Sequence, residues 1–573
     1  MDRGFCVGFG PAMPGLGSAA PRPAAGGARC KIVGDFTYCL EGAIYSSGPE
    51  RLEKFIAEAL RADSAPRCAA MVKDFVSQED GEFVVAAAQH GTGRSLLFND
   101  VLGRLPLFMA KASGGSGLVV GRSLSAVIAL RGGPLRSDRL GIASRLLFGY
   151  PLDSRTEHEG IESVPESSLV WVGSAGEMPT LIAGEVQFGG APENVGARCR
   201  SGGEGDLLEA LGNGLVRACE RRINRLRGWM PTLALSGGFD SRLVACALKR
   251  TGADVETITR TDYLSDRADA TTAEQVAAAL DFRHHAIPCG AIGMDLIRRL
   301  SGIGEGGLAI DVGHMLGFLE KARERIGPAR FLLTGDGGDK TAAPLLPLGR
   351  MTQSGEVARM MSALSSRELE ACRVLTGLSA AEIRDYIDQS LRSQPGRTVP
   401  EKVRALAFRQ RGRRWLNLGE DRNRTVFWST TPFYAPEYFF RANAIPDALK
   451  QRDRLYLRLL GWFDKRLARI SRPGRGRHRF ADRLLLEGHL QLGRSPLLTG
   501  LYRRMRPRKP IPAFRLFIAD DLCAARLRGG GIWEICDEQT FDRLFSNPPS
   551  ETFRSQLLAL ALWRGSDLAG PIS

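Results

Sequence analysis

The sequence has no apolar run long enough to cross a membrane, and its first residues lack the basic-then-apolar order of a secretory signal peptide. Its 11 cysteines are scattered singly, without a Cys-x-x-Cys pair, and none of its 7 histidines clusters with them. These absences argue against a membrane-spanning protein, a disulfide framework and a zinc site. We therefore expect a protein of the reducing cytoplasm.

Acidic residues are too few to balance the basic ones: 63 Asp and Glu face 78 Lys and Arg, a net charge of +15. Such an excess raises the question of nucleic acid binding. Much of the Arg, however, lies in helical-looking stretches at 401–424 and 451–472, mixed with Trp, Leu and Asp. We interpret most of it as solvated helix faces and as contacts to ATP or an acidic substrate. An acidic peptide or glycan is an alternative partner, and nucleic acid is the least favoured one.

One stretch carries the strongest functional signal, PTLALSGGFDSRLVACALKR at residues 231–250. Its apolar start predicts a buried parallel strand, and its later apolar residues recur at helical spacing. The SGGFDS turn between them would offer backbone N–H groups and a positive helix end to an anion. It contains no Lys, so it is not a Walker A loop.

SGGFDS resembles the pyrophosphate loop of the ATP pyrophosphatase group, whose members cut ATP to AMP and pyrophosphate. A second apolar run, FLLTGDGGDK at residues 331–340, also ends in a Gly-rich acidic turn. It resembles the asparagine synthetase loop that faces the first loop across the nucleotide, although Lys340 replaces the usual Glu. The resemblance implies ATP and pyrophosphate contacts from ten residues: Leu235, Ser236, Gly237, Gly238, Asp240, Ser241, Thr259, Gly335, Asp336 and Gly337. It also implies that Asp240 and Asp339 hold Mg²⁺.

The first part of the chain carries a second resemblance. Short β-type segments and one helical pattern at residues 49–61 predict an α+β sheet domain. Phrases at residues 80–85, 99–108 and 117–121 resemble, in order and spacing, the N-terminal glutaminase-type domain of asparagine synthetases. With SGGFDS following, the layout up to about residue 446 is similar to that family.

The glutaminase of that family uses an N-terminal Cys whose own α-amino group is the base. Here the sequence starts Met1-Asp2, and Cys6, the nearest cysteine, becomes N-terminal only after further trimming. Glu41 stands where the family has an Asn that helps bind the oxyanion, and a carboxylate cannot donate that hydrogen bond. The phrase that grips the glutamine carboxylate is also missing. We expect an inactive glutaminase domain retained as a scaffold.

Alternating strand and helix patterns after the first loop predict a second domain with a doubly wound parallel sheet. Strands are expected at 255–259 and 282–288, with a crossover helix at 268–280 between them. The expected fold is thus an N-terminal α+β sandwich of the N-terminal-nucleophile type, then an α/β ATP-pyrophosphatase domain with a helical C-terminal part. The expected domains are glutaminase-like (1–186), linker (187–206), synthetase (207–472), and Arg/Pro-rich arm with helical extension (473–573).

Two further site residues follow from the family resemblance. Glu305 falls near the family's substrate-side glutamate. Synthetases and cyclases of this family use a late Lys to stabilise charge as the amide forms, but residues 470–477 contain Arg and no Lys. Lys465 or an Arg would serve instead, or the chemistry would stop at adenylation.

The function favoured by this pattern is an amide ligase that uses ATP and Mg²⁺ to adenylate a substrate carboxylate for capture by an amine. The expected substrate is a small molecule or a peptide that carries a carboxylate, and the amine can belong to the substrate itself, as in relatives that close β-lactam or lasso-peptide rings. A glutamine-hydrolysing asparagine synthetase or amidotransferase is the alternative, and a non-catalytic scaffold is the third hypothesis. A homodimer or a biosynthetic partner protein is compatible with all three.

Overall fold

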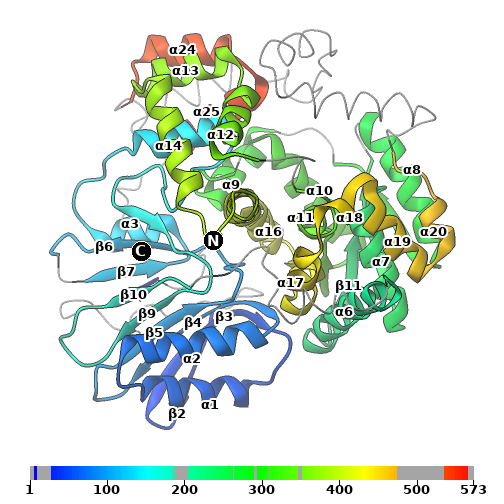
Figure 1. The fold of residues 1–573 in the computed structure, drawn as a ribbon, viewed down its shortest axis with the longest axis horizontal. Coiled ribbons are helices and arrows are strands. Elements are labelled where there is room, and N and C mark those ends of the chain that lie inside the picture. Colours follow the sequence, from blue (N-terminus) through cyan, green and yellow to red (C-terminus); the bar gives the residue numbers. More distant parts are fainter. Residues whose placement is uncertain are drawn as a thin grey trace.

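The computed structural model describes residues 6–9, 28–115, 117–184, 186, 204–261, 264–289, 293–308, 310–345, 351–473 and 535–564. In these ranges, no helix is both long and apolar enough to cross a membrane. The expected linker and the expected Arg/Pro-rich arm lie almost entirely outside them. Figure 1 shows antiparallel sheets at lower left, a parallel sheet with its helices at right, and a cluster of helices at the top.

Two antiparallel sheets form the first part of the chain. One has four strands in the order β1 (Cys6–Phe9), β7 (Leu118–Gly121), β6 (Phe108–Lys111) and β8 (Ile161–Ser163). The other has six in the order β10 (Thr180–Ile182), β9 (Leu169–Val172), β5 (Ser95–Asn99), β4 (Gly81–Gln89), β3 (Phe36–Ile44) and β2 (Arg29–Val33). The α+β sheet domain expected from the sequence is therefore present.

Strand β4 shows why the two sheets stack. Its side chains alternate, with Phe83 and Val85 in the core beneath the helices and Val84 and Ala86 in the core between the sheets. All four are fully buried, so both faces of the strand are covered. Helices α1 (Pro49–Leu60) and α2 (Ala65–Gln78) cover the outer face of the six-stranded sheet (Figure 1).

The segment at residues 31–40 differs from the single β-type segment expected there. It contains the end of β2 and the start of β3, which pair as a hairpin with Val33 opposite Phe36. Gly34 takes a φ of +56°, a conformation that glycine adopts without a steric penalty. A disulfide between Cys30 and Cys39 joins the two strands at directly opposed positions. The sequence did not predict this bridge, because the cysteines become neighbours only once the hairpin register is set.

The second half of the chain is built on a five-stranded parallel sheet. Its strands follow the order β13 (Arg283–Ile287), β12 (Glu256–Arg260), β11 (Met230–Ala234), β14 (Arg330–Leu333) and β15 (Trp428–Thr430). The chain moves outward from β11 through β12 to β13 and then returns to place β14 on the other side of β11. This confirms the predicted doubly wound sheet and puts its switch point between β11 and β14, where ligands bind in such folds.

Helices pack on both faces of the parallel sheet. Phe331 and Leu333 face one helical layer, whereas Leu332 between them faces the other. The first layer contains α6 (Glu204–Arg225), α7 (Phe239–Thr251), α8 (Leu264–Ala279), α19 (Arg454–Phe463) and α20 (Lys465–Arg469). The second is formed by α10 (Gly313–Ile326).

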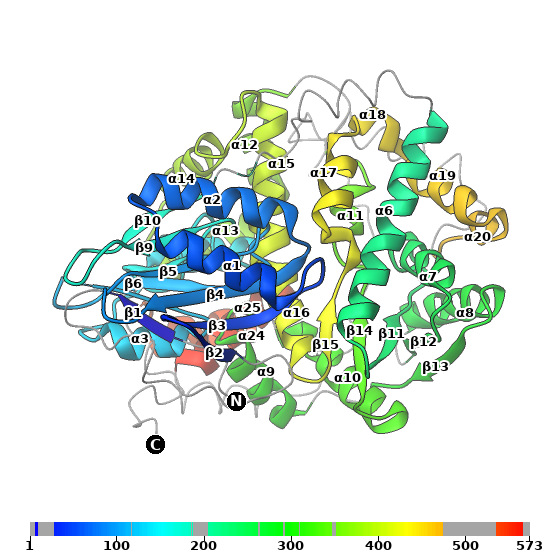
Figure 2. The ribbon, with the colours of Figure 1, turned by 90° about the horizontal axis from the view of Figure 1, so that it is seen from below.

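The remaining helices connect the two halves or form the cluster at the top of Figure 1. Beside the parallel sheet lie α9 (Met294–Gly304), η1 (Ile310–Val312), α11 (Gly338–Thr341), η2 (Phe408–Leu416), α16 (Asn417–Arg424), η3 (Pro432–Tyr434), α17 (Pro436–Ala444), α18 (Asp447–Lys450) and η4 (Gln451–Asp453). Figure 2 shows α16 and β15 between the antiparallel and the parallel sheets.

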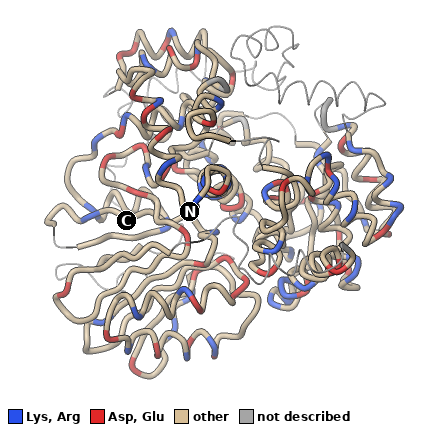
Figure 3. Tube along the Cα trace, viewed as in Figure 1, with Lys and Arg blue, Asp and Glu red and all other residues tan. Residues whose placement is uncertain are grey.

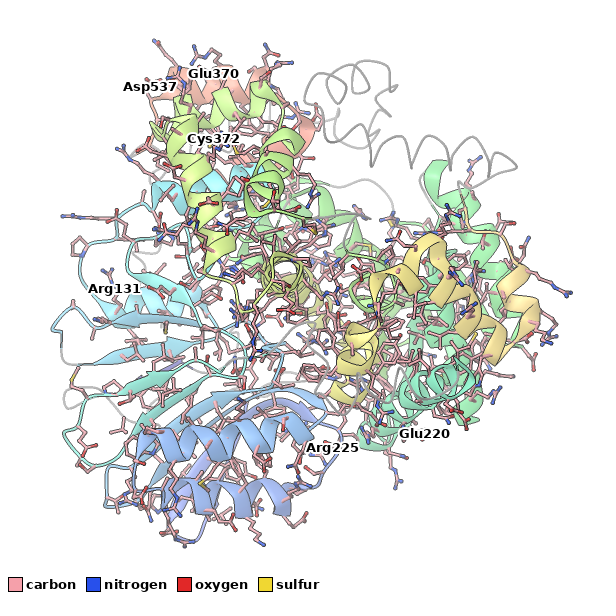
Figure 4. All side chains as sticks on the ribbon, viewed as in Figure 1. Arg131, Glu220, Arg225, Glu370, Cys372 and Asp537 are labelled. Carbon is pink, nitrogen blue, oxygen red and sulfur yellow. A yellow bond between two sulfur atoms is a disulfide. The ribbon has the colours of Figure 1, made fainter. Side chains whose placement is uncertain are left out.

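The cluster joins segments from distant parts of the chain. It contains α12 (Gln353–Ala363), α13 (Ser366–Thr376), α14 (Ala380–Arg392), α15 (Val399–Ala407), α24 (Glu538–Ser546) and α25 (Glu551–Arg564). They pack with α4 (Arg139–Phe148), while α3 (Leu124–Arg131) covers the four-stranded sheet together with Trp563. Cys372 is fully buried inside the cluster, and Glu370 and Asp537 lie at its outer edge (Figure 4). The C-terminal helices are thus packed into the body of the protein.

Buried arginines join the two halves, which corrects the interpretation of Arg as mostly solvated. Arg222 on α6 is fully buried and pairs with Asp80, which directly precedes β4, with N–O distances of 2.9 and 3.1 Å. Arg122 pairs with Glu41 at 2.8 Å and with Asp421 on α16 at 2.9 Å. On the surface, Lys and Arg are interleaved with Asp and Glu along the helices (Figure 3). Part of the basic excess therefore neutralises interior carboxylates.

Candidate functional site

The first Gly-rich loop leaves the carboxyl end of β11 and enters α7. Its two hydroxyls bond to each other, with 3.0 Å between Ser236 Oγ and Ser241 Oγ. Ser241 Oγ also accepts the Ser236 N–H at 3.0 Å, and Ser236 Oγ accepts the Gly238 N–H at 3.2 Å. The backbone N–H of Gly237 donates to Asp269 Oδ1 on α8 at 3.0 Å. The loop is therefore held closed by its own hydroxyls at the positive end of a helix.

The second Gly-rich loop leaves β14 and enters the short helix α11. Thr334 at its start donates to Glu420 Oε1 on α16 at 2.6 Å. Thr431, after β15, donates to the carbonyl of Asp336 at 2.7 Å. Gly337 has a φ of +87°, which lets the chain reverse at this point. Hydrogen bonds to α16 and to the residue after β15 thus hold the loop in place.

The two loops are in direct contact. A Cβ placed on Gly335 would lie 2.7 Å from the backbone nitrogen of Ser241, and one on Gly338 would lie 2.3 Å from Asp240 Oδ1. Neither distance is compatible with a side chain, so glycine is required at both positions. Asp240 additionally accepts a hydrogen bond from the Tyr456 hydroxyl on α19. The glycines of the second loop therefore bring it against the aspartate of the first.

Carboxylates converge where the loops meet. Burial raises the pKa of Asp240 to about 6, and the nearby charge of Asp339 adds to the rise. Burial also raises the pKa of Asp336 to about 7, with further contributions from Glu420, Asp339 and Asp240. Asp339 is half exposed and pairs with the buried Lys340. Neighbouring carboxylate charges thus add to the rise in the pKa of Asp240 and Asp336, because no cation of the described chain neutralises them fully.

Such a donor set suits Mg²⁺, which binds through one or two carboxylates together with phosphate oxygens. Of the predicted metal pair, Asp240 lines the cavity, whereas Asp339 is half exposed and does not line it. Asp336, which is buried and lines the cavity, is the second hard oxygen ligand beside Asp240. No group of three or more His, Cys, Asp or Glu side chains in the described residues forms a metal site by itself. The arrangement therefore fits a cation shared with a phosphate ligand rather than a metal held by protein alone.

A cavity of about 510 Å³ opens above these loops at the carboxyl ends of β11, β12 and β14. Its volume is in the range of small-molecule sites. Seven of the ten predicted nucleotide-binding residues line it directly, six of them in or next to the two loops: Leu235, Ser236, Asp240, Ser241, Gly335 and Asp336. Thr259 also lines the cavity, although its hydroxyl is donated to the carbonyl of Leu235. Gly237, Gly238 and Gly337 belong to the same two loops.

Two predicted catalytic residues lie elsewhere. Glu305 accepts hydrogen bonds from Ser123 Oγ at 2.6 Å, Leu124 N at 2.7 Å and Ser125 N at 3.0 Å, so it caps α3 of the first half. It lines a separate small cavity between the two halves. Lys465 is exposed at the start of α20 and does not line the large cavity. The structure therefore brings neither residue to the large cavity, and their catalytic roles stay predictions.

Side chains that the sequence did not assign to the site also reach the cavity. Trp415 at the end of η2 and Arg422 on α16 line it, and His314 on α10 lines it as well. Burial lowers the pKa of Arg422 to about 10. The sequence showed Trp415 and Arg422 only as part of an Arg-rich helical stretch. A signal was present in their spacing, since residues seven apart share a helix face.

Cys6, expected to be inert, lies on β1 opposite Gly121. Burial raises the pKa of its thiol to about 12, which leaves almost no thiolate at neutral pH. Glu41 is committed to its ion pair with Arg122. Neither residue presents an activated nucleophile or an oxyanion donor.

Comparison with known proteins locates the family signal in the second half of the chain. Residues 224–472 match the family model described as asparagine synthase. No curated protein matches the sequence. Among solved structures, an NMN synthetase from Francisella tularensis matches at 14% identity, covering 35% of this chain and 91% of that chain with a TM-score of 0.19. At that score the structural likeness adds no argument of its own.

Proposed function

Because residues 224–472 belong to the asparagine synthase family, we propose that the protein is an ATP-dependent amide ligase that forms AMP and pyrophosphate. The observation that carries the proposal is the contact of the two Gly-rich loops at the switch point, with Asp240 and Asp336 buried at one end of the cavity. A pyrophosphate leaving group needs hydrogen-bond donors and a cation on one side and an open cavity on the other. Here the loops supply hydroxyl donors and carboxylates that can hold a cation, and the cavity opens beside them.

In the proposed reaction, an oxygen of the substrate carboxylate attacks the α-phosphorus of ATP, and the bond to the bridging oxygen of pyrophosphate breaks. An amine then attacks the acyl carbon, loses a proton, and displaces AMP as the C–O bond breaks. Bound Mg²⁺ would neutralise the departing pyrophosphate. The loop N–H groups and the hydroxyls of Ser236 and Ser241 would orient the phosphates, and Asp240 and Asp336 would hold the cation.

For the first half of the chain we propose a glutaminase-like scaffold without glutaminase activity. Its support is the stacked pair of antiparallel sheets together with the high pKa of Cys6 and the ion pair of Glu41. The proposed boundaries are those expected from the sequence, 1–186 for this domain and 207–472 for the synthetase domain. The amine would then come from the substrate or from solution, and an amidotransferase activity is not favoured.

The decisive experiment supplies the purified full chain with radiolabelled ATP, Mg²⁺, a panel of carboxylic acids and hydroxylamine as a general amine. Hydroxylamine traps any acyl-adenylate as a hydroxamate. We expect AMP, pyrophosphate and a hydroxamate in equal amounts, with the activity lost in Asp240→Asn. Glu370→Gln, in an exposed pair with Arg373, is the matched control and should retain activity. Formation of ADP, or no binding of ATP at all, would contradict the proposal.

Glutamate release from glutamine, compared between the wild type and Cys6→Ala, tests the alternative. Release that disappears in Cys6→Ala would make the protein an amidotransferase. Equal background release in both would leave the ATP site as the active centre.

A further inference from the structure

One face of the η2–α16 segment lines the large cavity with Trp415, Gly419 and Arg422, and their neighbours Leu416 and Asn423 line it as well. Trp415, Gly419 and Arg422 are spaced by four and three positions, so they lie along one side of the helix. The distance from the first to the last is roughly 10 Å along the helix axis. The face therefore presents an aromatic ring at one end, a guanidinium at the other and no side chain between them.

Arg422 is a buried cation that forms no direct ion pair, although the charges of Asp336 and Glu420 act on it. Only 7% of its surface is exposed. Its Nε and Nη2 both donate to Asn423 Oδ1, at 3.3 and 2.9 Å, and no carboxylate of the described chain forms an ion pair with it. Glu420 is occupied by the hydroxyls of Thr334 and Ser429. A buried guanidinium that faces a cavity with a free donor is suited to an anionic ligand, because burying an unpaired charge is costly.

The space between the two ends is open, and part of its surroundings is apolar. A Cβ on Gly419 would meet only Arg422 Nη2, at 3.8 Å. Together with Arg260 and His314, apolar side chains from the loop before η1, from η1 and from α10 line the cavity: Leu308, Val312, Phe318 and Leu319. An ion-pairing end, an unobstructed middle and an apolar wall define a groove for a ligand with one charge and an apolar body.

We propose that this groove, between α16 and α10, binds the carboxylate substrate of the ligase, and that this substrate is an apolar monocarboxylate. Its carboxylate lies at Arg422, and its apolar body extends over Gly419 toward Trp415. The role of this ligand as the substrate to be adenylated rests on the proposed function. The inference adds the chemical class of that substrate. Free apolar acids and the C-terminus of an apolar peptide share this chemistry. Dicarboxylates such as aspartate fit less well, because their short chain leaves apolar residues of the groove, such as Leu308 and Phe318, uncovered.

Binding is measured by titration calorimetry on the full chain with Mg²⁺ and saturating α,β-methylene-ATP, which cannot release AMP. The probes are 4-phenylbutanoate, its amide, glutarate, and acetyl-leucyl-phenylalanine with a free or an amidated C-terminus. We expect 4-phenylbutanoate to bind about 10-fold more tightly than its amide, since a hydrogen bond to a charged group is lost. Glutarate should bind more weakly than 4-phenylbutanoate. The two peptides decide whether the groove also accepts a chain terminus.

Two variants test the groove by different means. Arg422→Gln should weaken 4-phenylbutanoate about 10-fold and α,β-methylene-ATP by less than about threefold. Gly419→Leu should block the acid by filling the open space, and a non-glycine residue is favourable in a helix, so folding is preserved. Arg441→Gln, an exposed arginine of α17 outside the cavity, is the charge-matched control and should bind both ligands normally.

The proposal is overturned if Arg422→Gln weakens the nucleotide and leaves the acid unchanged, since the guanidinium would then serve a phosphate. Tighter binding of glutarate, or no binding of any apolar acid, would also overturn it. Because the probe nucleotide cannot react, these results are independent of catalysis. Acid binding without AMP formation from ATP would count against the proposed function alone, whereas AMP formation only with dicarboxylates would count against the groove alone.

Discussion

The carboxylate of Asp240 lies against the Cα of Gly338, so close that a Cβ on Gly338 would stand 2.3 Å from its Oδ1. Asp240 lies in the first turn of α7, after β11, and Gly338 begins α11, after β14, so their contact joins the two Gly-rich loops. Any side chain at position 338 must therefore move either the aspartate or the second loop.

Gly338→Ala should reduce ATP-dependent AMP formation about 100-fold, because a displacement of about 1 Å in a catalytic group has an effect of this size. The measurement is the rate of AMP release at saturating ATP. Gly461→Ala is the control, since a Cβ there meets nothing within 4 Å. Equal activity in the two variants would show that the contact between the loops is not needed.

The acid cluster predicts an opposite pH dependence for stability and for ligand binding. The pKa values of Asp240, about 6, and Asp336, about 7, lie above the unfolded value of about 3.9. Between about pH 4 and 7 the folded protein holds protons that the unfolded chain has released, so the contribution of these groups to stability falls as pH rises. Mg-ATP should bind to the ionised carboxylates and so more tightly at the upper end of that range.

Melting temperatures measured with and without Mg-ATP from pH 5.5 to 8 check this prediction. The increase in melting temperature that Mg-ATP produces should become larger as pH rises and level off above about pH 7. In Asp336→Asn, the part of this change that occurs near pH 7 should be absent. An increase that is the same at every pH would contradict the assignment of these carboxylates to the cation.

The buried ion pair of Arg222 and Asp80 predicts a strong effect on stability. Arg222→Met would leave Asp80 as a buried charge without its main partner, at a cost of about 3–5 kcal/mol. The partly exposed pair of Arg217 and Glu437 is the control, and Arg217→Met should change stability by about 1 kcal/mol or less. The midpoint of urea unfolding, followed by tryptophan fluorescence, separates the two cases. Similar midpoints for both variants would show that the buried pair does not hold the halves together.

Because Glu305 accepts three hydrogen bonds from the start of α3, we expect its substitution to reduce stability and to leave catalysis unchanged. Glu305→Gln weakens charge-assisted hydrogen bonds to Ser123, Leu124 and Ser125, each worth about 1.5–3 kcal/mol in its charged form. The melting temperature should fall while the KM for ATP stays unchanged. A lower kcat with an unchanged melting temperature would instead support the substrate-side role that the family resemblance suggested.

Much of the fold was predictable because it follows from local patterns. The strands at β11, β12 and β13 and the crossover helix α8 were recognised from short apolar runs alternating with helical periodicity. Their hydrogen bonds confirm a parallel sheet. The hairpin of β2 and β3 was missed because its two-residue turn interrupts a stretch of uniform β-type composition.

The sequence by itself determined the two Gly-rich loops, because a strand, a turn that requires glycine and a helix are all encoded by neighbouring residues. Only the tertiary structure decided which distant side chains meet them. Arg222 and Asp80 are 142 positions apart, and Glu305 meets a helix 181 positions away. The groove of Trp415, Gly419 and Arg422 depends likewise on how α16 packs beside α10. Such pairings arise from the burial of charge and apolar surface across the whole chain, which no local pattern records.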